Sequence, residues 1–275
     1  MKNQDLATVA SSRHGIEQAA RDIYDAYTTK QTCASVRRHL APRDLAGAYS
    51  VQEANTVRWL AEGRRLSGRK IGLTAKIVQK NANIDQPDYG MLFSDMEIAD
   101  GDTIPAGTLF QPKAEGEIAF VLERDLTQEN PSLAEVVRAT AYALPALEII
   151  DTRITDWDLD IVDTIADNAS SGLYVLGASP RKIDQIDLLL CGMVIERNGD
   201  PVSFGAGIAC LGHPLNALRW LARTMVRLGR PLHAGDVVMS GALGPMVRSH
   251  DGEYLEARIN GLGSVGVQFG PRKAQ

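Results

Sequence analysis

Of the 275 residues in the chain, 44% are hydrophobic and 23% are charged, a balance typical of a soluble globular protein. The length suits either one large domain with an extension or two small domains. Its net charge of −5 comes from 29 basic and 34 acidic residues without a long basic block, which argues against a nucleic-acid or anionic-membrane surface. Three widely spaced cysteines and the lack of a long apolar segment argue against a disulfide framework and indicate a cytoplasmic protein.

Residues 1–65 are predicted to be helical. Apolar residues recur at helical spacing from Ile16 to Tyr27 and again from Asp44 to Glu62, and Pro42 precedes the second stretch. We expect this region to serve as a scaffold or as an oligomer contact.

At Gly68 the pattern changes to short strands separated by turns rich in glycine and proline. A strand is expected at 68–74, a short helix from Ala75, and a turn at 85–90. A helix over 136–143 is expected to run into a strand that ends at Ile150, and the polar segment 163–171 to form a helical turn or loop.

The last third of the chain is predicted to be mostly β-structure. A strand over 188–196 is followed by Asn198-Gly199, which favours a type I′ turn, and a helix is expected over 214–228. Strands are expected at 236–240, 254–259 and 264–269. The sequence therefore predicts an α+β fold, with a helical N-terminal region at 1–65 and a mainly β, barrel-like domain at 66–275.

An acidic pair stands at the head of a buried strand. Glu115 and Glu117 precede the apolar run 118–122 and, two residues apart in a strand, point to the same face. Two like charges on a half-buried face repel each other and are costly to desolvate, so a proton or a divalent cation is expected to relieve them.

A third carboxylate, Glu148, lies in the second apolar strand. Three acidic oxygens from two strands suit a hard cation such as Mg²⁺ or Mn²⁺. The alternative is a rim of solvated glutamates balanced by Lys113 and Arg153.

Several other side chains are candidates for chemistry, each with an ordinary structural alternative. Lys70 lies between a basic turn and an apolar strand, where it is a proton carrier, a clamp for a substrate carboxylate, or a surface lysine. Asp85 and Asp88 flank a proline turn and either cap it or supply a general base. The remaining candidates are the polar residues Asp163, Asp167, Asn168 and Ser170, and the turn 241–246, which contains Leu243 and Gly244.

Seven motifs together resemble those of a known family. They are Lys70-Ile-Gly-Leu-Thr74, Asp85-Gln-Pro-Asp-Tyr-Gly90, Gln111-Pro-Lys-Ala-Glu-Gly-Glu117, Leu144-Pro-Ala-Leu-Glu148, Asp163-Thr-Ile-Ala-Asp-Asn-Ala-Ser170, Leu211-Gly-His-Pro-Leu-Asn216 and Gly241-Ala-Leu-Gly-Pro-Met246. The chain resembles the 2-keto-4-pentenoate hydratases, in the hydratase/decarboxylase branch of the fumarylacetoacetate hydrolase superfamily. The resemblance runs in order over nearly the whole chain.

The resemblance implies a fumarylacetoacetate-hydrolase-type β domain with Mg²⁺ or Mn²⁺ held by Glu115, Glu117 and Glu148. It also implies a homo-oligomer that hydrates 2-hydroxypenta-2,4-dienoate to 4-hydroxy-2-oxopentanoate in the meta-cleavage degradation of aromatic compounds. Proton carriers would be Lys70 with Asp85 or Asp88. The implied substrate contacts are Asn168, Ser170, Leu243 and Gly244.

Other functions stay open within the same resemblance. A 4-oxalocrotonate decarboxylase shares the acidic strand and the Asp-Asn-Ala-Ser segment, although the segment 241–246 is the hydratase-like version. A longer 2-hydroxydienoate is a further possible substrate, and association with the next pathway enzyme a further possible interaction. A non-catalytic partner of such an enzyme would not need the charged cluster.

Overall fold

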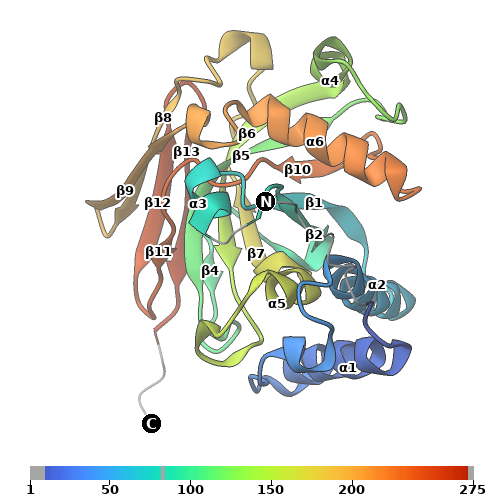
Figure 1. Cartoon of the computed structure of the whole chain (residues 1–275). Helices are drawn as coiled ribbons and strands as arrows, with labels where there is room; N and C mark the ends of the chain where they lie inside the picture. The colour runs from blue at the N-terminus through green and yellow to red at the C-terminus, as the bar shows by residue number, and fades with distance from the viewer. Residues whose placement is uncertain (1–9, 82–83, 272–275) are drawn as a thin grey trace, which may run out of the picture. The chain divides into compact units, whose positions relative to one another are not determined.

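The computed structural model describes residues 10–81 and 84–271, and the chain divides into two compact units (Figure 1). The first unit contains the described residues up to Gly63 together with Thr152–Ser170, and the second contains Arg64–Asp151 and the residues from Ser171 onward. The helical unit thus includes, besides the predicted N-terminal region, a second segment that interrupts the β domain in sequence.

The first unit is built from short and long helices. Its elements are α1 (Arg13–Thr29), η1 (Val36–His39), α2 (Leu45–Ala61), η3 (Thr155–Trp157), α5 (Ile161–Ala166) and η4 (Asn168–Ser170). The side chain of Ser12 caps α1 by accepting a hydrogen bond from the N–H of Gly15 at 3.0 Å, and the side chain of Asp44 caps α2 by accepting one from Gly47 at 3.0 Å. Both predicted N-terminal helices are confirmed.

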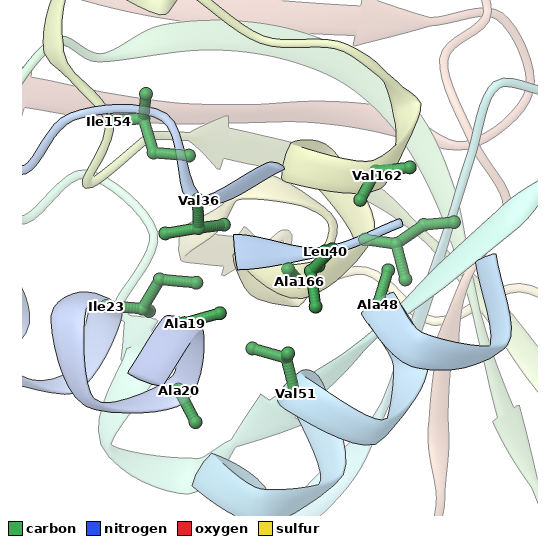
Figure 2. Packing of buried hydrophobic residues seen from close by; sticks show 11 residues of the cluster. Ala19, Ala20, Ile23, Val36, Leu40, Ala48, Val51, Ile154, Val162 and Ala166 are labelled. Carbon is green, nitrogen blue, oxygen red and sulfur yellow. The ribbon is translucent and has the colours of Figure 1, made fainter. Parts of the chain in front are cut away.

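The core of this unit joins the two chain segments (Figure 2). Apolar residues on α1, η1 and α2 form one cluster with apolar residues of the second segment. The buried set is Ala19, Ala20, Ile23, Val36, Leu40, Ala48, Val51, Ile154, Val162, Ile165 and Ala166. The segment 152–170 is therefore part of this core rather than a surface loop.

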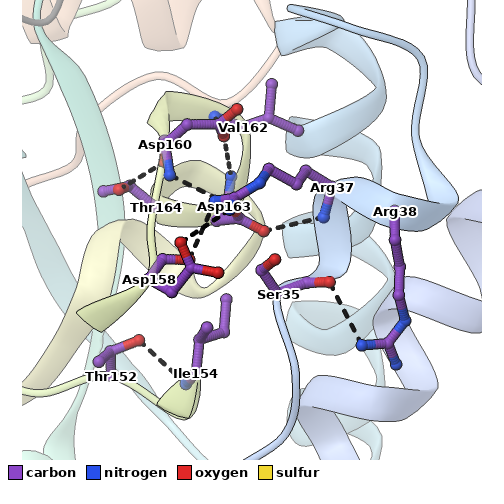
Figure 3. Close-up of polar contacts among 10 residues, drawn as sticks. All are labelled: Ser35, Arg37, Arg38, Thr152, Ile154, Asp158, Asp160, Val162, Asp163 and Thr164. Atoms are coloured by element: carbon purple, nitrogen blue, oxygen red, sulfur yellow. Dashed lines mark hydrogen bonds and ion pairs between the residues drawn. The ribbon is translucent and has the colours of Figure 1, made fainter. Parts of the chain in front are cut away.

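Polar contacts also tie η1 to α5 (Figure 3). Asp160 and Asp163 form a reciprocal cap at the start of α5, and one Asp163 oxygen accepts from the backbone N–H of Arg37 at 2.8 Å. The Arg37 guanidinium donates to the other Asp163 oxygen at 2.6 Å. The helical turn expected around 163–171 is present, and Asp163 holds it in place.

The second unit contains an eight-stranded mixed sheet. Its strands are β1 (Leu66–Gly72), β2 (Asp88–Phe93), β3 (Glu97–Ile98), β5 (Lys113–Leu122), β6 (Thr140–Ile150), β7 (Ser171–Leu176), β10 (Val237–Met239) and β11 (Val247–Arg248). Seven of them follow the order β2-β1-β10-β5-β6-β7-β3, and β11 pairs with β5. The long antiparallel pair β5–β6 lies in the middle of this order.

A second sheet has five strands in the order β4-β13-β12-β8-β9. They are β4 (Thr103–Ile104), β8 (Gly192–Arg197), β9 (Asp200–Ala206), β12 (Tyr254–Ile259) and β13 (Gly263–Phe269). At the β8–β9 turn Asn198 and Gly199 both have positive φ, 51° and 90°, as a type I′ turn requires. The α+β class predicted from the sequence is confirmed.

The helices of the second unit are α3 (Lys76–Asn81), α4 (Leu133–Ala139) and α6 (Pro214–Arg227), with short turns η2 (Ser94–Met96), η5 (Ile183–Gln185) and η6 (Gly207–Ala209). Helix α6 starts at Pro214, as predicted, and packs against α4. The helix expected over 136–143 ends at Ala139, because Thr140 is already extended and pairs with Leu122 in the sheet. None of the helices in residues 10–81 and 84–271 is long and apolar enough to cross a membrane.

Candidate active site

Three carboxylates meet on one face of the eight-stranded sheet. Glu115 on β5 lies directly opposite Glu148 on β6, and Glu117 follows two residues later on the same face. One oxygen from each of the three lies within 4.8 Å of the other two. Glu117 and Glu148 are fully buried and Glu115 is half-buried, so the rim of solvated glutamates considered above does not describe Glu117 or Glu148.

Lys70 joins this cluster from β1. It is in register with Met239 of β10, which is in register with Ala119 of β5, and this pairing sets Lys70 on the carboxylate face. Its Nζ lies 2.9 Å from Oε1 of Glu148. Burial alone lowers the pKa of the Lys70 ammonium, but the negative charges of Glu148, Asp88 and Glu115 together raise that pKa above its ordinary value. Lys70 is therefore a buried, permanently charged partner of the acidic cluster.

The structure distinguishes the two candidate aspartates. Asp88 begins β2, is 2% exposed, and pairs with Gly72 in the sheet, two residues along the ladder from the Lys70–Gly90 pair. Burial raises the pKa of Asp88 to about 6, against the opposing effect of the Lys70 charge. Asp85 is exposed in the bend before β2. Asp88 thus shares a sheet face with Lys70, and Asp85 points to solvent.

Gly72 makes room for Asp88. A Cβ atom at Gly72 would lie 2.2 Å from Oδ1 of Asp88, far inside van der Waals contact. A glycine inside a strand is a sequence signal for such a close approach, but it does not identify the residue that packs against it.

Burial and the neighbouring carboxylates disfavour the charged forms of Glu115 and Glu117. Burial, with the charge of Glu148 next, raises the pKa of Glu115 to about 7 and raises the pKa of Glu117 well above its ordinary value. Within the described residues, Oε1 of Glu117 and Oε2 of Glu148 are buried without a hydrogen-bond partner. Buried oxygens of this kind require a proton or a cation. Three close carboxylates with such oxygens fit a hard divalent ion such as Mg²⁺ or Mn²⁺.

The segment after β10 borders the cluster. The N–H of Gly241 donates to Oε2 of Glu117 at 2.9 Å. The N–H of Leu243 donates to the carbonyl of Gly116 at 3.0 Å, and Gly244 packs against Met193 and Phe204. The N–H of Gly241 is therefore directed at a glutamate side chain, and the N–H of Leu243 is already bonded to the backbone.

Asn168 and Ser170 lie in the first unit, where both are buried in η4. Together with Ala169 they form three consecutive residues with positive φ, 55°, 51° and 54°. Asp167 just before them accepts from Nε of Arg153 at 2.6 Å and from the Thr152 hydroxyl at 2.8 Å. Arg153 thus forms a buried ion pair with Asp167.

From the sequence, Gly241 was part of the candidate turn 241–246, but Ser240 and Cys210 were passed over. Gly241 binds the carboxylate of Glu117, Ser240 precedes Gly241, and the Cys210 thiol donates to the carbonyl of Ser240 at 2.9 Å. Burial raises the pKa of Cys210 to about 12, so this thiol keeps its proton. Only the glycine after a strand was a usable signal, since the contacts join segments that are distant in sequence.

Comparison with known proteins gives the same family over most of the chain. The model described as "Fumarylacetoacetate (FAA) hydrolase C-terminal" matches residues 60–269. The chain is 53% identical to 2-keto-4-pentenoate hydratase 1 of Dechloromonas aromatica (strain RCB), over 92% of this chain and 96% of that protein. It is 52% identical to the 2-keto-4-pentenoate hydratase of Paraburkholderia xenovorans (strain LB400), over 92% of this chain and 94% of that protein.

A solved structure of a related enzyme has the same fold. The 4-oxalocrotonate decarboxylase from Pseudomonas putida G7, complexed with magnesium and adipate, superposes with a TM-score of 0.88 at 31% identity, covering 94% of this chain and 98% of that one. The higher identity to the hydratases agrees with the hydratase-like segment 241–246. The chain belongs to the fumarylacetoacetate hydrolase family and, within it, to the branch of the 2-keto-4-pentenoate hydratases.

Proposed function

We propose that the protein is a metal-dependent hydro-lyase that adds water to 2-hydroxypenta-2,4-dienoate and forms 4-hydroxy-2-oxopentanoate, in the meta-cleavage degradation of aromatic compounds. The observation that carries the proposal is the cluster of the buried residues Glu117, Glu148 and Lys70 with the half-buried Glu115, in a chain 53% identical to a 2-keto-4-pentenoate hydratase.

The three glutamates would hold the metal, Mg²⁺ or Mn²⁺. Support comes from their close oxygens and from the buried oxygens of Glu117 and Glu148 without a hydrogen-bond partner in the described chain. When bound, the ion supplies Lewis-acid stabilisation of negative charge on the substrate's carboxylate and 2-oxygen. The magnesium of the decarboxylase from Pseudomonas putida G7 is a precedent in a relative 31% identical.

The reaction needs proton carriers on the carboxylate face. The 2-hydroxyl loses its proton and C5 gains one, which gives a ketone with a double bond between C3 and C4. Water then adds its oxygen to C4 and a proton to C3. Asp88, with a pKa of about 6, suits a group that takes and returns protons near neutral pH. We assign this role to Asp88 rather than to the exposed Asp85.

Lys70 has a different part in this proposal. Its raised pKa keeps the ammonium charged, so Lys70 stabilises Glu148 and the negative charge that develops on a substrate oxygen. Asn168 and Ser170 would orient the substrate or the water, and Leu243 and Gly244 would contact it. Support for these four is the resemblance, and for Ser170 also a buried hydroxyl without a hydrogen-bond partner in the described residues.

The test is a spectroscopic assay with purified protein. We expect Mg²⁺ to support loss of the ultraviolet band of 2-hydroxypenta-2,4-dienoate with 4-hydroxy-2-oxopentanoate as product, and we expect EDTA or Glu117→Gln to stop it. Glu123→Gln is the matched control, because Glu123 follows the same strand but is exposed. Release of CO₂ from 4-oxalocrotonate, without hydration of 2-hydroxypenta-2,4-dienoate, would show that the protein is a decarboxylase and not a hydratase. Turnover in EDTA would refute the metal site.

A cytoplasmic location, a homo-oligomeric assembly and association with the next pathway enzyme also belong to the proposal. They rest on the composition of the chain and on the resemblance, and size-exclusion chromatography coupled to light scattering tests the assembly.

A further inference from the structure

The end of β10 leaves the regular ladder with β5 at Ser240. The two strands pair in register up to Met239 and Ala119, so Ser240 stands opposite Ile118. The N–H of Ser240 donates to the carbonyl of Ile118 at 2.9 Å, as an antiparallel pair requires. The return bond is different, because the N–H of Ile118 donates to the Ser240 hydroxyl at 3.2 Å. A side-chain oxygen thus takes the place of the backbone carbonyl.

The displaced carbonyl of Ser240 has another partner. It accepts from the thiol of Cys210 at 2.9 Å, and Cys210 is fully buried. The Ser240 hydroxyl in turn donates to the carbonyl of Gly241 at 3.0 Å. These bonds hold the Ser240–Gly241 peptide in an orientation that the regular ladder would not give it.

The reoriented peptide aims its N–H at a functional side chain. Gly241 has φ +96° and donates to Oε2 of Glu117 at 2.9 Å. A Cβ at Gly241 would lie 2.5 Å from the Thr74 side chain and 2.9 Å from the carbonyl of Ile71, so only glycine fits. Two residues later the N–H of Leu243 bonds to Gly116 and the segment rejoins β5.

We propose that Ser240, Gly241 and Cys210 are positioning residues that hold Glu117 in the orientation needed to bind the metal. The Gly241 N–H holds Oε2, while Oε1, buried and without a hydrogen-bond partner in the described chain, stays available as a ligand. The inference rests on the proposed function, since it takes Glu117 as a metal ligand. Groups that orient a ligand in this way typically change metal affinity by about 10–100-fold when removed.

The experiment measures Mn²⁺ binding to the whole protein by the electron paramagnetic resonance signal of free Mn²⁺. We expect Ser240→Ala to weaken binding about 10–100-fold, because the N–H of Ile118 and the carbonyl of Gly241 lose their partner. Cys210→Ala should also weaken binding, and Cys210→Ser should stay near the wild type because a hydroxyl still donates to the Ser240 carbonyl.

Ser203→Ala is the matched control. Ser203 is also buried, and its hydroxyl donates to the carbonyl of Pro245 in the same segment at 2.7 Å, rather than to Gly241. We expect it to bind Mn²⁺ like the wild type. Thermal unfolding in EDTA shows whether each variant is folded before metal is added.

The outcomes separate the inference from the proposed function. Failure of the wild type to bind Mn²⁺ would refute the proposed metal site itself. Binding that is lost in Glu117→Gln but unchanged in Ser240→Ala would overturn the positioning role and leave the metal site intact. Should Ser240→Ala not fold, the cysteine pair decides, and equal affinities of Cys210→Ala and Cys210→Ser would overturn the inference.

Discussion

Two buried charge clusters, one in each unit, differ in how their oxygens are satisfied. In the first unit each Asp167 oxygen has a donor, since Nε of Arg153 binds Oδ1 at 2.6 Å and the Thr152 hydroxyl binds Oδ2 at 2.8 Å. In the second unit Lys70 contacts Glu148 at 2.9 Å, yet Oε1 of Glu117 and Oε2 of Glu148 have no hydrogen-bond partner in the described residues.

The comparison shows which property separates a structural cluster from a candidate site. Burial raises the pKa of Asp167 as well as that of Glu117, so the direction of the shift does not distinguish them. The hydrogen bonds do. A buried carboxylate that the chain itself satisfies stabilises the fold or a local geometry, whereas one with an unsatisfied oxygen indicates a ligand.

The largest effect is expected when the unsatisfied cluster loses one carboxylate. Glu148→Gln removes a proposed metal ligand and the ion-pair partner of Lys70, so hydration of 2-hydroxypenta-2,4-dienoate should fall by at least about 10²–10³-fold. Steady-state kinetics at saturating Mg²⁺ measures it. Activity within a few fold of the wild type would show that Glu148 is not part of the active site.

Removing a charge from the satisfied Arg153–Asp167 cluster should lower the stability of the protein. Asp167→Ala leaves the Arg153 charge buried without its carboxylate, and we expect the free energy of unfolding to fall by about 3–5 kcal/mol. Urea denaturation measures this change. The double variant Arg153→Met with Asp167→Leu removes both charges and should cost less than the single change. A cost below about 1 kcal/mol for Asp167→Ala would erase the distinction between the clusters.

The pH dependence of the metal-free protein should sharpen the contrast. Glu115 has a folded-state pKa of about 7 against an ordinary value of 4.5, so the folded protein keeps protons that the unfolded chain has already released between these values. The free energy of unfolding contributed by this group therefore falls as pH rises through that window. In EDTA we expect a lower unfolding temperature at about pH 8 than at about pH 5.5.

Mg²⁺ should restore the unfolding temperature most strongly at the higher pH, where the metal competes with fewer protons. Glu115→Gln in EDTA is the control for the same experiment, because it removes one titrating carboxylate and should flatten the pH dependence. An unfolding temperature in EDTA that rises steadily toward pH 8 would contradict the pKa direction.

The smallest effect is expected at an exposed ion pair. Arg13 and Glu17 on α1 are 2.9 Å apart, but their side chains are 94% and 52% exposed. Glu17→Ala should change the free energy of unfolding by less than about 0.5 kcal/mol, measured by urea denaturation. A loss as large as that of Asp167→Ala would mean that distance, rather than burial, decides what an ion pair contributes.

The sequence predicts the elements better than it predicts their partners. Apolar spacing indicated α1, α2 and α6, and the two-residue period of a strand set Glu115 and Glu117 on one face. The position of Glu148 opposite Glu115 depends on the β5–β6 register, which single-strand patterns do not contain. The composition of the turn also did not show which of Asp85 and Asp88 is buried, since it is the pairing of Asp88 with β1 that buries it.

The site is also assembled from distant parts of the chain. Lys70 reaches the carboxylate face because β10 lies between β1 and β5 in the sheet, although β10 follows β1 by more than 160 residues in the sequence. Helix α4 was expected to run on to residue 143, but pairing of β6 with β5 overrides the local preference at Thr140. Local periodicity in the sequence contains no information about these pairings between strands.

The two-segment core of the first unit has a consequence for biosynthesis. Helices α1 and α2 leave the ribosome early, but Ile154, Val162, Ile165 and Ala166, which complete their core, are translated about 90 to 105 residues after α2 ends. The part of the core that the second segment covers therefore stays incomplete while β1 to β6 are made, a period in which nascent chains are prone to aggregate. A nascent chain that stops at Asp151 has both helices but lacks the four residues of the second segment that complete their core.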